Sequence, residues 1–539
     1  MRTHEFDVVV VGGGAAGLSA ALAAREAGAS VALLEASGVF GGTASWTGGA
    51  FWAPLNRYEM EQGAEDSREK VLTYMRQCAE GRGDEVLFKT YLDAAPGLID
   101  FLERVSPLKI TPGSMPDYQG HIEGAITKPG QSRSVAPDAF DLNLLGDKRA
   151  LARRSPHGTM PYSFPEFEEM GITIHPELLD WADYQKRIDQ GLVGWGEALA
   201  AGLLAGCIDR KVALFPNTRG RALLQNGRVE GVRADGPDGP VEFRAKAVVL
   251  TTGGFEWNEE EMARHFPCPI EPATVPTNRG DGLAMARDAG AALGNMNTLW
   301  GWPSIVLDGE TQEDGHKLVR TSLFERLLPH MICVNGQGER FADETISYHR
   351  LLKIMIQQDD KGGFPNLPAF HIFDRQYRER YPFGPVMPGG ADPDWLKGYP
   401  TLAALAAAIG VPAAALQRTV RTYNASVAKG RDDEFQRGGG GYATFFGDRE
   451  NKPTPNMGTI EKAPFYAVPM IPGTIGTCGG PRFNTSGQVL AESGAPITGL
   501  YAAGNVTAAF SGPSYFGPGG TLGPALIFGA IAGKAAAAS

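Results

Sequence analysis

The stretch from residue 6 to residue 35 constrains the fold more than any other part of the chain. A β-branched run, Val8 to Val11, leads directly into Gly12-Gly13-Gly14-Ala15-Ala16-Gly17, and an alanine-rich segment follows that ends at Gly28. A second apolar run, 30–34, ends at Glu35. This order predicts a buried strand, a glycine turn, a helix and a second parallel strand. We therefore expect an α/β protein built around a parallel sheet.

The glycines and the acid of this unit have the spacing of a dinucleotide-binding site. We expect Gly12 to form the tight turn, Gly14 to bring the backbone close to a pyrophosphate, and Gly17 to allow close helix–strand packing. Glu35 is expected to accept hydrogen bonds from a ribose diol. A glycine motif alone is weak evidence, but here it coincides with the strand, the helix, the second strand and the terminal acid.

Length and composition narrow the classes of protein further. A chain of 539 residues predicts two domains or three. The net charge of −11 argues against nucleic acid as a partner. No apolar run is long enough to span a bilayer and the N-terminus does not resemble a signal peptide, so we expect a cytoplasmic protein. The cysteines lie far apart without a CxxC pair, which predicts reduced thiols and no metal site: Cys78, Cys207, Cys268, Cys333 and Cys478.

Three further segments resemble the two-dinucleotide-binding flavoproteins. Gly41-Gly42-Thr43-Ala44-Ser45, followed by Gly48-Gly49, is similar to the glycine cluster that surrounds the pyrophosphate and the isoalloxazine. Lys246 to Phe255, a strand followed by TTGG, looks like the returning strand of an FAD domain, and Gly499 to Asn505 resembles the last strand that contacts FAD. The resemblance implies FAD as the cofactor. The expected cofactor-binding residues are Gly12, Gly14, Ala15, Ala16, Gly17, Glu35, Ala36, Gly41, Gly42, Thr43, Ser45, Gly48, Gly49, Ala213, Thr252, Gly253, Gly254, Asp281, Gly504, Asn505, Gly520 and Leu522.

The rest of the chain is organised around this cofactor domain. We expect a discontinuous Rossmann-like FAD-binding domain, residues 1–279 and 446–539, with an inserted α+β substrate domain at 280–445. Strands on either side of the Asn226-Gly227 turn resemble the β-meander of such flavoproteins, with 212–215 as its first strand. The run 438–441 reads as a hinge or loop of glycines. The active site should lie where the two domains meet.

Another glycine-rich stretch, Ser514 to Thr521, precedes a helical run from Leu522 to Ala532. Glycine at this place suggests a backbone that approaches a ligand closely, and a helix start carries free N–H groups that favour a negative charge. Tyr515 could present an O–H donor to the same ligand.

These motifs resemble the fumarate reductase/succinate dehydrogenase flavoprotein superfamily, and within it the 3-ketosteroid dehydrogenases. Gly476-Thr477-Cys478-Gly479-Gly480, Gly504-Asn505 and Tyr515 to Gly519 are similar to the GTxGG, GN and Y-P-G-x-G segments of the steroid enzymes. Gly338 to Tyr348 is similar to the "GxRFxNE" strand that precedes a tyrosine, and Pro116-Asp117-Tyr118 stands in the position of an early active-site tyrosine.

The resemblance implies a set of catalytic residues. Tyr515 O–H and Gly519 N–H would polarise a ketone, Tyr348 would be the base, and Tyr118 would hydrogen-bond to it and relay the proton. The hydride would go to flavin N5. The superfamily's covalent members attach FAD to a histidine just after the GG cluster; Ser45-Trp46-Thr47 stands there, which implies non-covalent FAD.

Two departures from the family pattern bear on the substrate pocket. Phe516 stands where proline is usual, which affects the expected shape of the pocket, and Pro481 replaces a larger apolar residue. Arg482 beside it either lies at the surface or reaches a polar substrate.

The residues leave several functions open. Each tyrosine could instead be a packing residue with its hydroxyl satisfied. The leading hypothesis is an FAD-dependent 3-ketosteroid Δ1-dehydrogenase acting on an apolar ketone, with an electron acceptor that the sequence does not identify and with peripheral membrane contact left open. The alternatives are a Δ4-(5α)-dehydrogenase, a related enone reductase, and a flavoprotein that serves as a lipid- or ketone-binding module without turnover.

Overall fold

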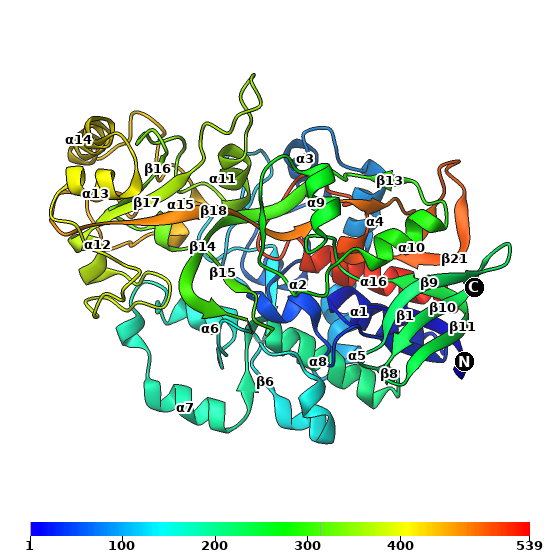
Figure 1. Ribbon diagram of the computed structural model, residues 1–539. Helices are drawn as coiled ribbons and strands as arrows, with labels where there is room; N and C mark the ends of the chain where they lie inside the picture. Colours follow the sequence, from blue (N-terminus) through cyan, green and yellow to red (C-terminus); the bar gives the residue numbers. More distant parts are fainter. Residues whose placement is uncertain (1, 313) are drawn as a thin grey trace.

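Two β-sheets organise the molecule, whose computed structural model describes residues 2–312 and 314–539 (Figure 1). Within those residues the larger sheet has eight strands. Its main path is β20 (Gln488–Leu490), β21 (Pro496–Ala502), β11 (Gly239–Leu250), β1 (Arg2–Val11), β2 (Val31–Leu34) and β8 (Ala213–Phe215). The two remaining strands, β9 (Arg219–Gln225) and β10 (Val229–Gly236), branch from β11.

The centre of this sheet is parallel, as the sequence predicts. β1 pairs in parallel with both β2 and β11, and β11 pairs in parallel with β21. The meander is confirmed as β9, β10 and β11, which are antiparallel. The expectation that 212–215 begins this meander is wrong, because β8 pairs in parallel with β2 at the far edge. Its side chains are only half-buried there.

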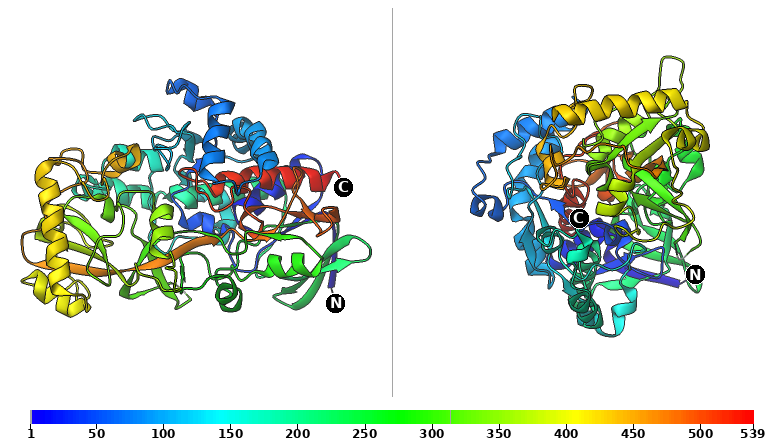
Figure 2. Two further views of the ribbon diagram at one scale, coloured as in Figure 1. Left: turned by 90° about the horizontal axis from the view of Figure 1, so that it is seen from above. Right: turned by 90° about the vertical axis from the view of Figure 1, so that its left-hand side faces the viewer.

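Helix α1 (Ala15–Glu26) lies against α16 (Leu522–Ala537), the last helix of the chain (Figure 2). The two backbones approach closely because α16 carries glycine at the contact. A Cβ on Gly529 would lie 2.5 Å from the carbonyl oxygen of Ala16, and one on Gly533 would lie 2.1 Å from that of Ala20. This packing fixes the start of α16 beside the glycine turn after β1.

The second sheet has six strands within the described residues. They are β15 (Lys317–Thr321), β14 (Leu299–Thr311), β18 (Phe465–Thr477), β17 (Ala369–Asp374), β16 (Met331–Asn335) and β12 (Glu271–Pro272). Helices α13 (Leu402–Ile409) and α14 (Ala413–Lys429) cover its outer part at the end of the molecule away from both termini (Figure 1). The two helices are separated at Gly410, whose φ is +73°.

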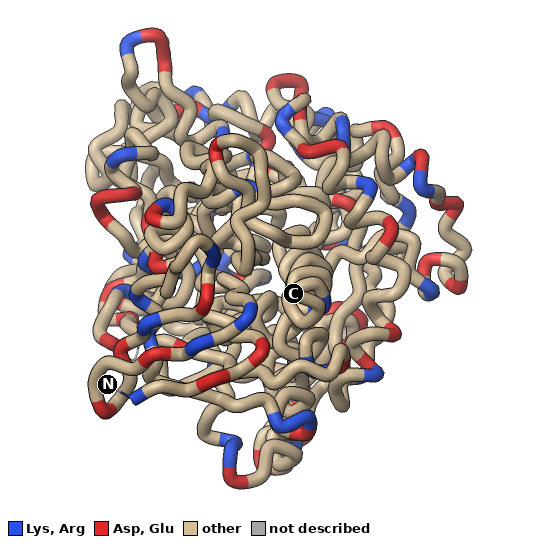
Figure 3. Tube along the Cα trace, turned by 90° about the vertical axis from the view of Figure 1, so that its right-hand side faces the viewer, with Lys and Arg blue, Asp and Glu red and all other residues tan. Residues whose placement is uncertain are grey.

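The chain leaves the large sheet after β11, reaches the second sheet first at β12, before α10 (Asp281–Asp288), and returns to the large sheet after β18. The domain boundaries expected after 279 and 445 stay a prediction. The glycine run at 438–441 is fixed in place, since Gly438 N–H donates to the Thr345 hydroxyl (2.9 Å) and Gly441 begins α15 (Gly441–Phe446). On the face seen in Figure 3, acidic and basic residues are interspersed.

The remaining elements lie between or around the sheets. The helices are α2 (Arg57–Glu61), α3 (Arg68–Cys78), α4 (Glu85–Ala94), α5 (Leu98–Val105), α6 (Phe164–Glu169), α7 (Trp181–Asp189), α8 (Trp195–Asp209), α9 (Glu259–His265), α11 (Tyr348–Met355) and α12 (Arg375–Arg380). Short strands are β3 (Phe51–Trp52), β4 (Ile110–Pro112), β5 (Ser134–Pro137), β6 (Phe140–Asp141), β7 (Leu192–Val193), β13 (Leu293–Gly294) and β19 (Gly480–Pro481). Short 3-10 helices are η1 (Gly42–Trp46), η2 (Ala95–Gly97), η3 (Leu142–Leu151), η4 (Pro176–Leu178), η5 (Glu325–Leu327) and η6 (Gly504–Val506).

Candidate functional site

A cavity of about 640 Å³ runs from the β1–α1 turn to a group of tyrosines near the second sheet. One end is lined by glycines of the large sheet and the other by aromatic side chains such as Trp302 and Phe446. Most of the expected cofactor residues line this one cavity: Gly12, Gly14, Ala15, Ala16, Glu35, Ala36, Gly42, Thr43, Ser45, Gly48, Gly49, Thr252, Gly253, Asp281, Gly504, Asn505 and Leu522.

The other expected cofactor residues lie outside the cavity wall: Gly17, Gly41, Ala213, Gly254 and Gly520. Gly17 packs against the turn, where a Cβ would lie 1.8 Å from the Gly12 carbonyl oxygen. Gly41 supports the turn through an N–H bond to the Gly13 carbonyl (2.8 Å). Ala213 sits in the edge strand β8, opposite Ala32.

The glycine turn has room for a ligand at one position only. A Cβ on Gly12 would lie 2.4 Å from the Thr251 carbonyl oxygen, and φ at Gly12 is +110°. At Gly14, by contrast, a Cβ would meet nothing closer than Gly42 Cα at 3.9 Å, and this open side faces the cavity. Gly14 is also the residue that precedes α1, whose start no side chain caps. The arrangement fits a pyrophosphate at the helix start.

Polar groups along the cavity are oriented by neighbouring residues. The Glu35 carboxylate accepts hydrogen bonds from Gly13 N–H (2.9 Å) and from Ser37 N–H (2.9 Å). Asp281 is held by Arg219 at 2.7 Å. Thr43 accepts a bond from the Asn278 amide (3.2 Å). The buried Ser45 hydroxyl has no protein partner. These groups supply the acceptors and donors that a dinucleotide needs.

Tyr118, Tyr348 and Tyr515 meet at the other end of the cavity. The Tyr348 hydroxyl donates to the Tyr118 hydroxyl at 3.2 Å. The ring centroids of Tyr348 lie 5.2 Å from those of Tyr118 and 5.5 Å from those of Tyr515, both edge-on. Tyr118 and Tyr515 are stacked at 5.6 Å. The three residues expected from widely separated motifs therefore form one aromatic cluster.

Burial controls the acidity of these phenols. It raises the pKa of Tyr118 and of Tyr348 well above the ordinary tyrosine value, and it raises the pKa of Tyr515 as well. A buried phenolate is unfavourable unless a hydrogen bond or a positive charge compensates it. The cluster thus provides hydroxyl donors directly, whereas a basic phenolate needs support from outside the three rings.

Tyr348 is the first residue of helix α11. The expectation that a strand runs through the Gly338–Tyr348 motif is wrong, because β16 ends at Asn335 and the motif is a loop. His349 follows Tyr348 and is buried, with Nε2 2.8 Å from the Pro513 carbonyl oxygen. Burial lowers the pKa of His349 to about 4, so its ring is neutral near pH 7 and braces the 513–515 loop.

Side chains from distant segments hold the loop that carries Tyr515 by its carbonyl groups. Trp300 Nε1 donates to the Ser514 carbonyl (3.0 Å), and the Ser134 hydroxyl donates to the Pro518 carbonyl (2.7 Å). The Phe516 carbonyl accepts from the Tyr74 hydroxyl and from the N–H of Tyr118 (3.1 Å). Because Tyr118 is bonded to this loop, its ring and that of Tyr515 are positioned together.

Gly519 occupies a position that no other residue can fill without displacement. Its φ is +73°, and a Cβ would lie 2.0 Å from the Ala50 carbonyl oxygen. Gly519 lines the cavity, and its N–H has no hydrogen-bond partner among the described residues. The N–H is therefore free to donate to a ligand beside Tyr515.

The residues that depart from the family pattern lie away from the cavity. Phe516 is buried behind the loop, with its ring 5.1 Å from Trp52 and 6.1 Å from Phe88, so it packs in the core and does not shape the pocket wall. Arg482 is exposed, and Pro481 lies in β19. Of the two alternatives for Arg482, the surface position is the observed one.

Several lining residues carry no motif and were not predicted. Met115, Trp302, Phe446 and Ile475 make the walls near the tyrosines apolar. Tyr442, from α15, packs edge-on against Tyr118 with centroids 5.1 Å apart. An aromatic pair four residues apart, Tyr442 and Phe446, is the signal that could have indicated a helix face there.

The described residues also bear on metal binding and on membrane insertion. No group of three or more His, Cys, Asp or Glu side chains among them is arranged to hold a metal ion. None of the helices they form has both the length and the apolar character needed to cross a membrane.

Comparison with known proteins relates this geometry to a family. Residues 7–522 match the family described as "FAD binding domain". The chain is 36% identical over 543 residues to a 4-oxocyclohexanecarboxylate 2-dehydrogenase of Sinomonas cyclohexanicum, covering 98% of this chain and 92% of the relative. It is also 36% identical over 566 residues to a 3-oxosteroid 1-dehydrogenase of Mycolicibacterium smegmatis, covering 99% and 97% of the two chains.

A solved structure matches the fold over the whole chain. It is a 3-ketosteroid Δ1-dehydrogenase from Sterolibacterium denitrificans in complex with 1,4-androstadiene-3,17-dione. The TM-score is 0.91 at 36% sequence identity, and the match covers 99% of this chain and 100% of the other. The α/β flavoprotein fold expected from the sequence is confirmed.

Proposed function

The chain belongs to the FAD-binding flavoprotein family, and on that premise we propose that it is a 3-ketosteroid Δ1-dehydrogenase. Its family and its relatives show that it is an FAD-dependent dehydrogenase. In the proposed reaction a 3-ketosteroid loses one hydrogen from C1 and one from C2, giving a 1,4-dien-3-one.

FAD would lie along the glycine-lined end of the cavity and be held without a covalent bond. Gly14 and the uncapped start of α1 would face its pyrophosphate, and Glu35 its ribose. Ser45-Trp46-Thr47 offers no histidine for covalent attachment. When bound, FAD supplies the acceptor that takes the hydride from C1 at N5.

Tyr348 is the proposed base that takes the proton from C2. Its hydroxyl lies in an apolar part of the cavity, bonded to Tyr118, which gives the proton a path away from the substrate. Positioned proton transfer of this kind contributes about 10²–10⁴-fold to rate.

Tyr515 O–H and Gly519 N–H are proposed to bind the C3 carbonyl oxygen. The proton at C2 becomes acidic only as negative charge develops on that oxygen, so donors there act chiefly in the transition state. Gly519 is suited to this because its N–H is unpaired and its backbone is fixed against Ala50.

The observation that carries the proposal is the convergence of two functions at one end of the cavity. The bonded phenol pair Tyr348–Tyr118 provides the base, and the loop with Tyr515 and Gly519 provides the donors. A ketone between them would meet both, next to the glycine-lined end where the flavin is expected.

An uncharged substrate suits this cavity better than a carboxylate. The arginines that line it, Arg219 and Arg320, are already paired with Asp281 and Glu310. Binding an anion near the aromatic walls would therefore leave its charge without a free partner. This favours a steroid ketone over a 4-oxocyclohexanecarboxylate, and supplying both as competing substrates tests the choice.

The direct test is turnover of 4-androstene-3,17-dione by purified, FAD-loaded protein with an artificial electron acceptor. We expect acceptor reduction and formation of the 1,4-diene. Tyr348→Phe should abolish most turnover and keep FAD, whereas Tyr423→Phe, at a buried tyrosine of helix α14, should leave turnover intact. Equal activity in both variants would refute the assignment of the base.

Regiochemistry needs its own experiment. A Δ4-(5α)-dehydrogenase would act on a 5α-saturated 3-ketosteroid and give the 4-ene, and an enone reductase would run the reaction toward saturation. Separate incubations with 5α-saturated and 4-ene substrates, with the products identified, distinguish these alternatives from Δ1 chemistry.

A further inference from the structure

A chain of hydrogen bonds runs from the buried acid Glu256 to the cofactor end of the cavity. Glu256 lies two residues after the TTGG turn and is 3% exposed. Its Oε1 atom accepts from the Thr274 hydroxyl (2.8 Å) and from the Asn278 side-chain amide (2.7 Å). The same amide nitrogen donates to the Thr43 hydroxyl oxygen (3.2 Å). Thr43 and Asn278 line the cavity and Glu256 does not, so the acid can affect a ligand through these side chains without touching it.

The direction of each hydrogen bond follows from its neighbours. Trp257 Nε1 donates to the Thr274 hydroxyl oxygen (3.1 Å), and the Thr274 hydroxyl passes its own proton to Glu256. Because Oε1 of Glu256 accepts both of its bonds, Asn278 must present its NH2 group to this atom. Turning the Asn278 amide over would place its carbonyl oxygen against Oε1, an acceptor against an acceptor. The acid therefore fixes which end of the amide faces Thr43.

Thr43 ends this chain of hydrogen bonds at the cavity wall. Its hydroxyl oxygen accepts from Asn278 and from the N–H of Val275 (3.4 Å), which occupies both lone pairs. The hydroxyl proton has no acceptor within the part of the chain that the structure describes. Since Thr43 lines the cavity, this proton is available to a ligand there. Thr43 is therefore a hydrogen-bond donor whose polarity is set by the residues behind it.

The place of Thr43 in the fold indicates which ligand receives the proton. Its neighbour Gly42 packs against Gly14, where a Cβ on Gly42 would lie 3.1 Å from Gly14 Cα. Gly14 in turn faces the open cavity at the start of α1. This is the end of the cavity that fits the dinucleotide, and FAD is the cofactor of the family. Phosphate, ribityl and ring atoms give FAD hydrogen-bond acceptors along its whole length.

We infer that Glu256 is a positioning residue for cofactor binding: it holds the Asn278 amide in the orientation that makes Thr43 donate its hydroxyl proton to FAD. The inference rests on FAD as the cofactor and is independent of the steroid reaction. It gives Glu256, which no sequence motif marked, a role at a site that it does not touch.

Glu256 serves in this role as an acceptor at a fixed place and not as a charge. Both of its partners, Thr274 and Asn278, are neutral side chains. Burial raises the pKa of Glu256, which favours the neutral acid. Its second oxygen, Oε2, is buried without a hydrogen-bond partner among the described residues, so Oε1 alone makes the side-chain contacts. A residue that keeps an oxygen at the position of Oε1 should therefore replace Glu256.

The test is the dissociation constant of FAD, measured by dilution and ultrafiltration of FAD-loaded protein without substrate. Thr43→Val keeps the shape of the side chain and removes the donor, so it should raise the constant about tenfold, whereas Thr43→Ser should not. Glu256→Asp keeps the carboxyl group but withdraws it from Asn278 by one methylene, and should raise the constant by a similar factor. Glu256→Gln keeps the oxygen in place and should leave the constant unchanged.

A double variant distinguishes positioning from an independent effect on FAD. If Glu256 acts through Thr43, Thr43→Val combined with Glu256→Asp should raise the dissociation constant no more than either change alone, about tenfold. Independent contributions would multiply to about a hundredfold, and that result would overturn the inference. A wild-type constant in Glu256→Asp, or a raised constant in Glu256→Gln, would overturn it as well.

A matched control separates this role from a general loss of stability. Asp374, at the end of β17, is another fully buried acid, and it accepts hydrogen bonds from two main-chain N–H groups at 2.7 Å. Asp374→Asn should lower the melting temperature and leave the FAD dissociation constant unchanged. Weaker FAD binding in Asp374→Asn, equal to that in Glu256→Asp, would show that the effect is one of stability and would refute the positioning role.

A second variant keeps the inference testable if Glu256→Asp fails to fold. Thr274→Val removes one of the two bonds that hold Oε1 and is close in shape to the residue it replaces. It should raise the FAD dissociation constant less than Thr43→Val does, and it should add nothing when the two are combined. A multiplied effect in that combination would again overturn the inference.

Failure of this inference and failure of the proposed function are distinguishable, because FAD binding is measured without a steroid. If the wild type converts 4-androstene-3,17-dione but the effects at Thr43 and Glu256 multiply, the inference alone is wrong. If no steroid is converted and the effects do not multiply, the proposed function is wrong and the inference stands.

Discussion

Gly519→Ala is the perturbation whose consequences can be worked out most fully from the structure. Two costs combine at this position. The backbone φ of +73° is left-handed, which costs an alanine about 1 kcal/mol. The new Cβ would lie 2.0 Å from Ala50 O and 2.3 Å from Phe51 Cα, both main-chain atoms, so the loop must move. Overpacking of this kind adds about 1–3 kcal/mol.

A matched control exists in Gly227, whose φ is also +73° but whose Cβ position has no atom within 4 Å. Gly227→Ala should therefore cost about 1 kcal/mol of stability, and Gly519→Ala about 2–4 kcal/mol. Both are single methyl additions, so the difference between them isolates close packing at Gly519 from its backbone conformation.

The effect on turnover follows from the displacement of the donor. Relief of the clash with Ala50 requires a shift of the Gly519 backbone, and its N–H would then no longer point to the substrate carbonyl. Loss of one such donor lowers kcat by about 10²–10³-fold. Gly227 lies in the turn between β9 and β10, so Gly227→Ala should keep wild-type kcat.

Thermal unfolding and steady-state dehydrogenation of both variants decide the matter, with the FAD content of each preparation measured first. The reasoning is refuted if Gly519→Ala matches Gly227→Ala in both melting temperature and kcat. A large loss of stability with unchanged kcat would support close packing at Gly519 and refute its role as a hydrogen-bond donor to the substrate.

Three further predictions concern the cofactor turn, a buried acid and the loop support. Gly14→Val should fold yet retain less FAD, because the new side chain enters the cavity. Gly17→Val should fold poorly, because its Cβ would lie 1.8 Å from the Gly12 carbonyl oxygen. Flavin absorbance of the purified proteins and their soluble yield test this pair of variants. Burial raises the pKa of Glu168 from 4.5 to about 8, so the folded protein keeps a proton that the unfolded chain releases, and stability falls as pH rises from 4.5 to 8. Glu168→Gln should flatten that fall in melting temperature against pH, and an unchanged slope would contradict the assignment. Trp300→Phe removes the bond to the Ser514 carbonyl and should cost about 1 kcal/mol and lower kcat; Trp181→Phe, at an exposed site, should change neither.

The parts predicted well from sequence are those in which local pattern and tertiary role agree. The β1–turn–α1–β2 unit shows this, since valines, glycines and Glu35 each have one physical use there. The same holds for the C-terminal loop, where glycine is required by the backbone itself. The three phenols came from family motifs, and the structure brings them together, although their roles stay a proposal.

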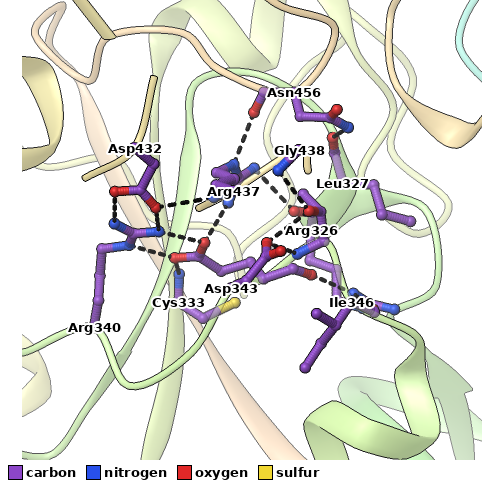
Figure 4. Close-up of polar contacts among 12 residues, drawn as sticks. Arg326, Leu327, Cys333, Arg340, Asp343, Ile346, Asp432, Arg437, Gly438 and Asn456 are labelled. Carbon is purple, nitrogen blue, oxygen red and sulfur yellow. Dashed lines mark hydrogen bonds and ion pairs between the residues drawn. The ribbon is translucent and has the colours of Figure 1, made fainter. Parts of the chain in front are cut away.

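The parts missed depend on contacts between segments far apart in the chain. The strand expected before Tyr348 is a loop, because Arg340 and Arg437 form ion pairs with Glu344 there (Figure 4). The pattern of apolar residues in a sequence does not reveal such ion pairs. Tyr442 lies in a segment without a motif, where its four-residue spacing from Phe446 is the local signal. Phe516 was expected to alter the shape of the substrate pocket, because residues next to it in sequence line the cavity. Its side chain packs in the core instead.

The long strand β18 has a mechanical consequence. Its first half pairs with β17 in the outer part of the second sheet, and its second half pairs with β14 as far as Thr477. Thr477 accepts a hydrogen bond from Phe255 N–H, beside the TTGG turn of the large sheet. A continuous strand of 13 residues, about 43 Å long, therefore spans both halves of the molecule and resists bending between them. Bending between the halves would break its ladder, so a bulky ligand should enter by displacement of surface loops, and amide hydrogens along β18 should be among the slowest to exchange.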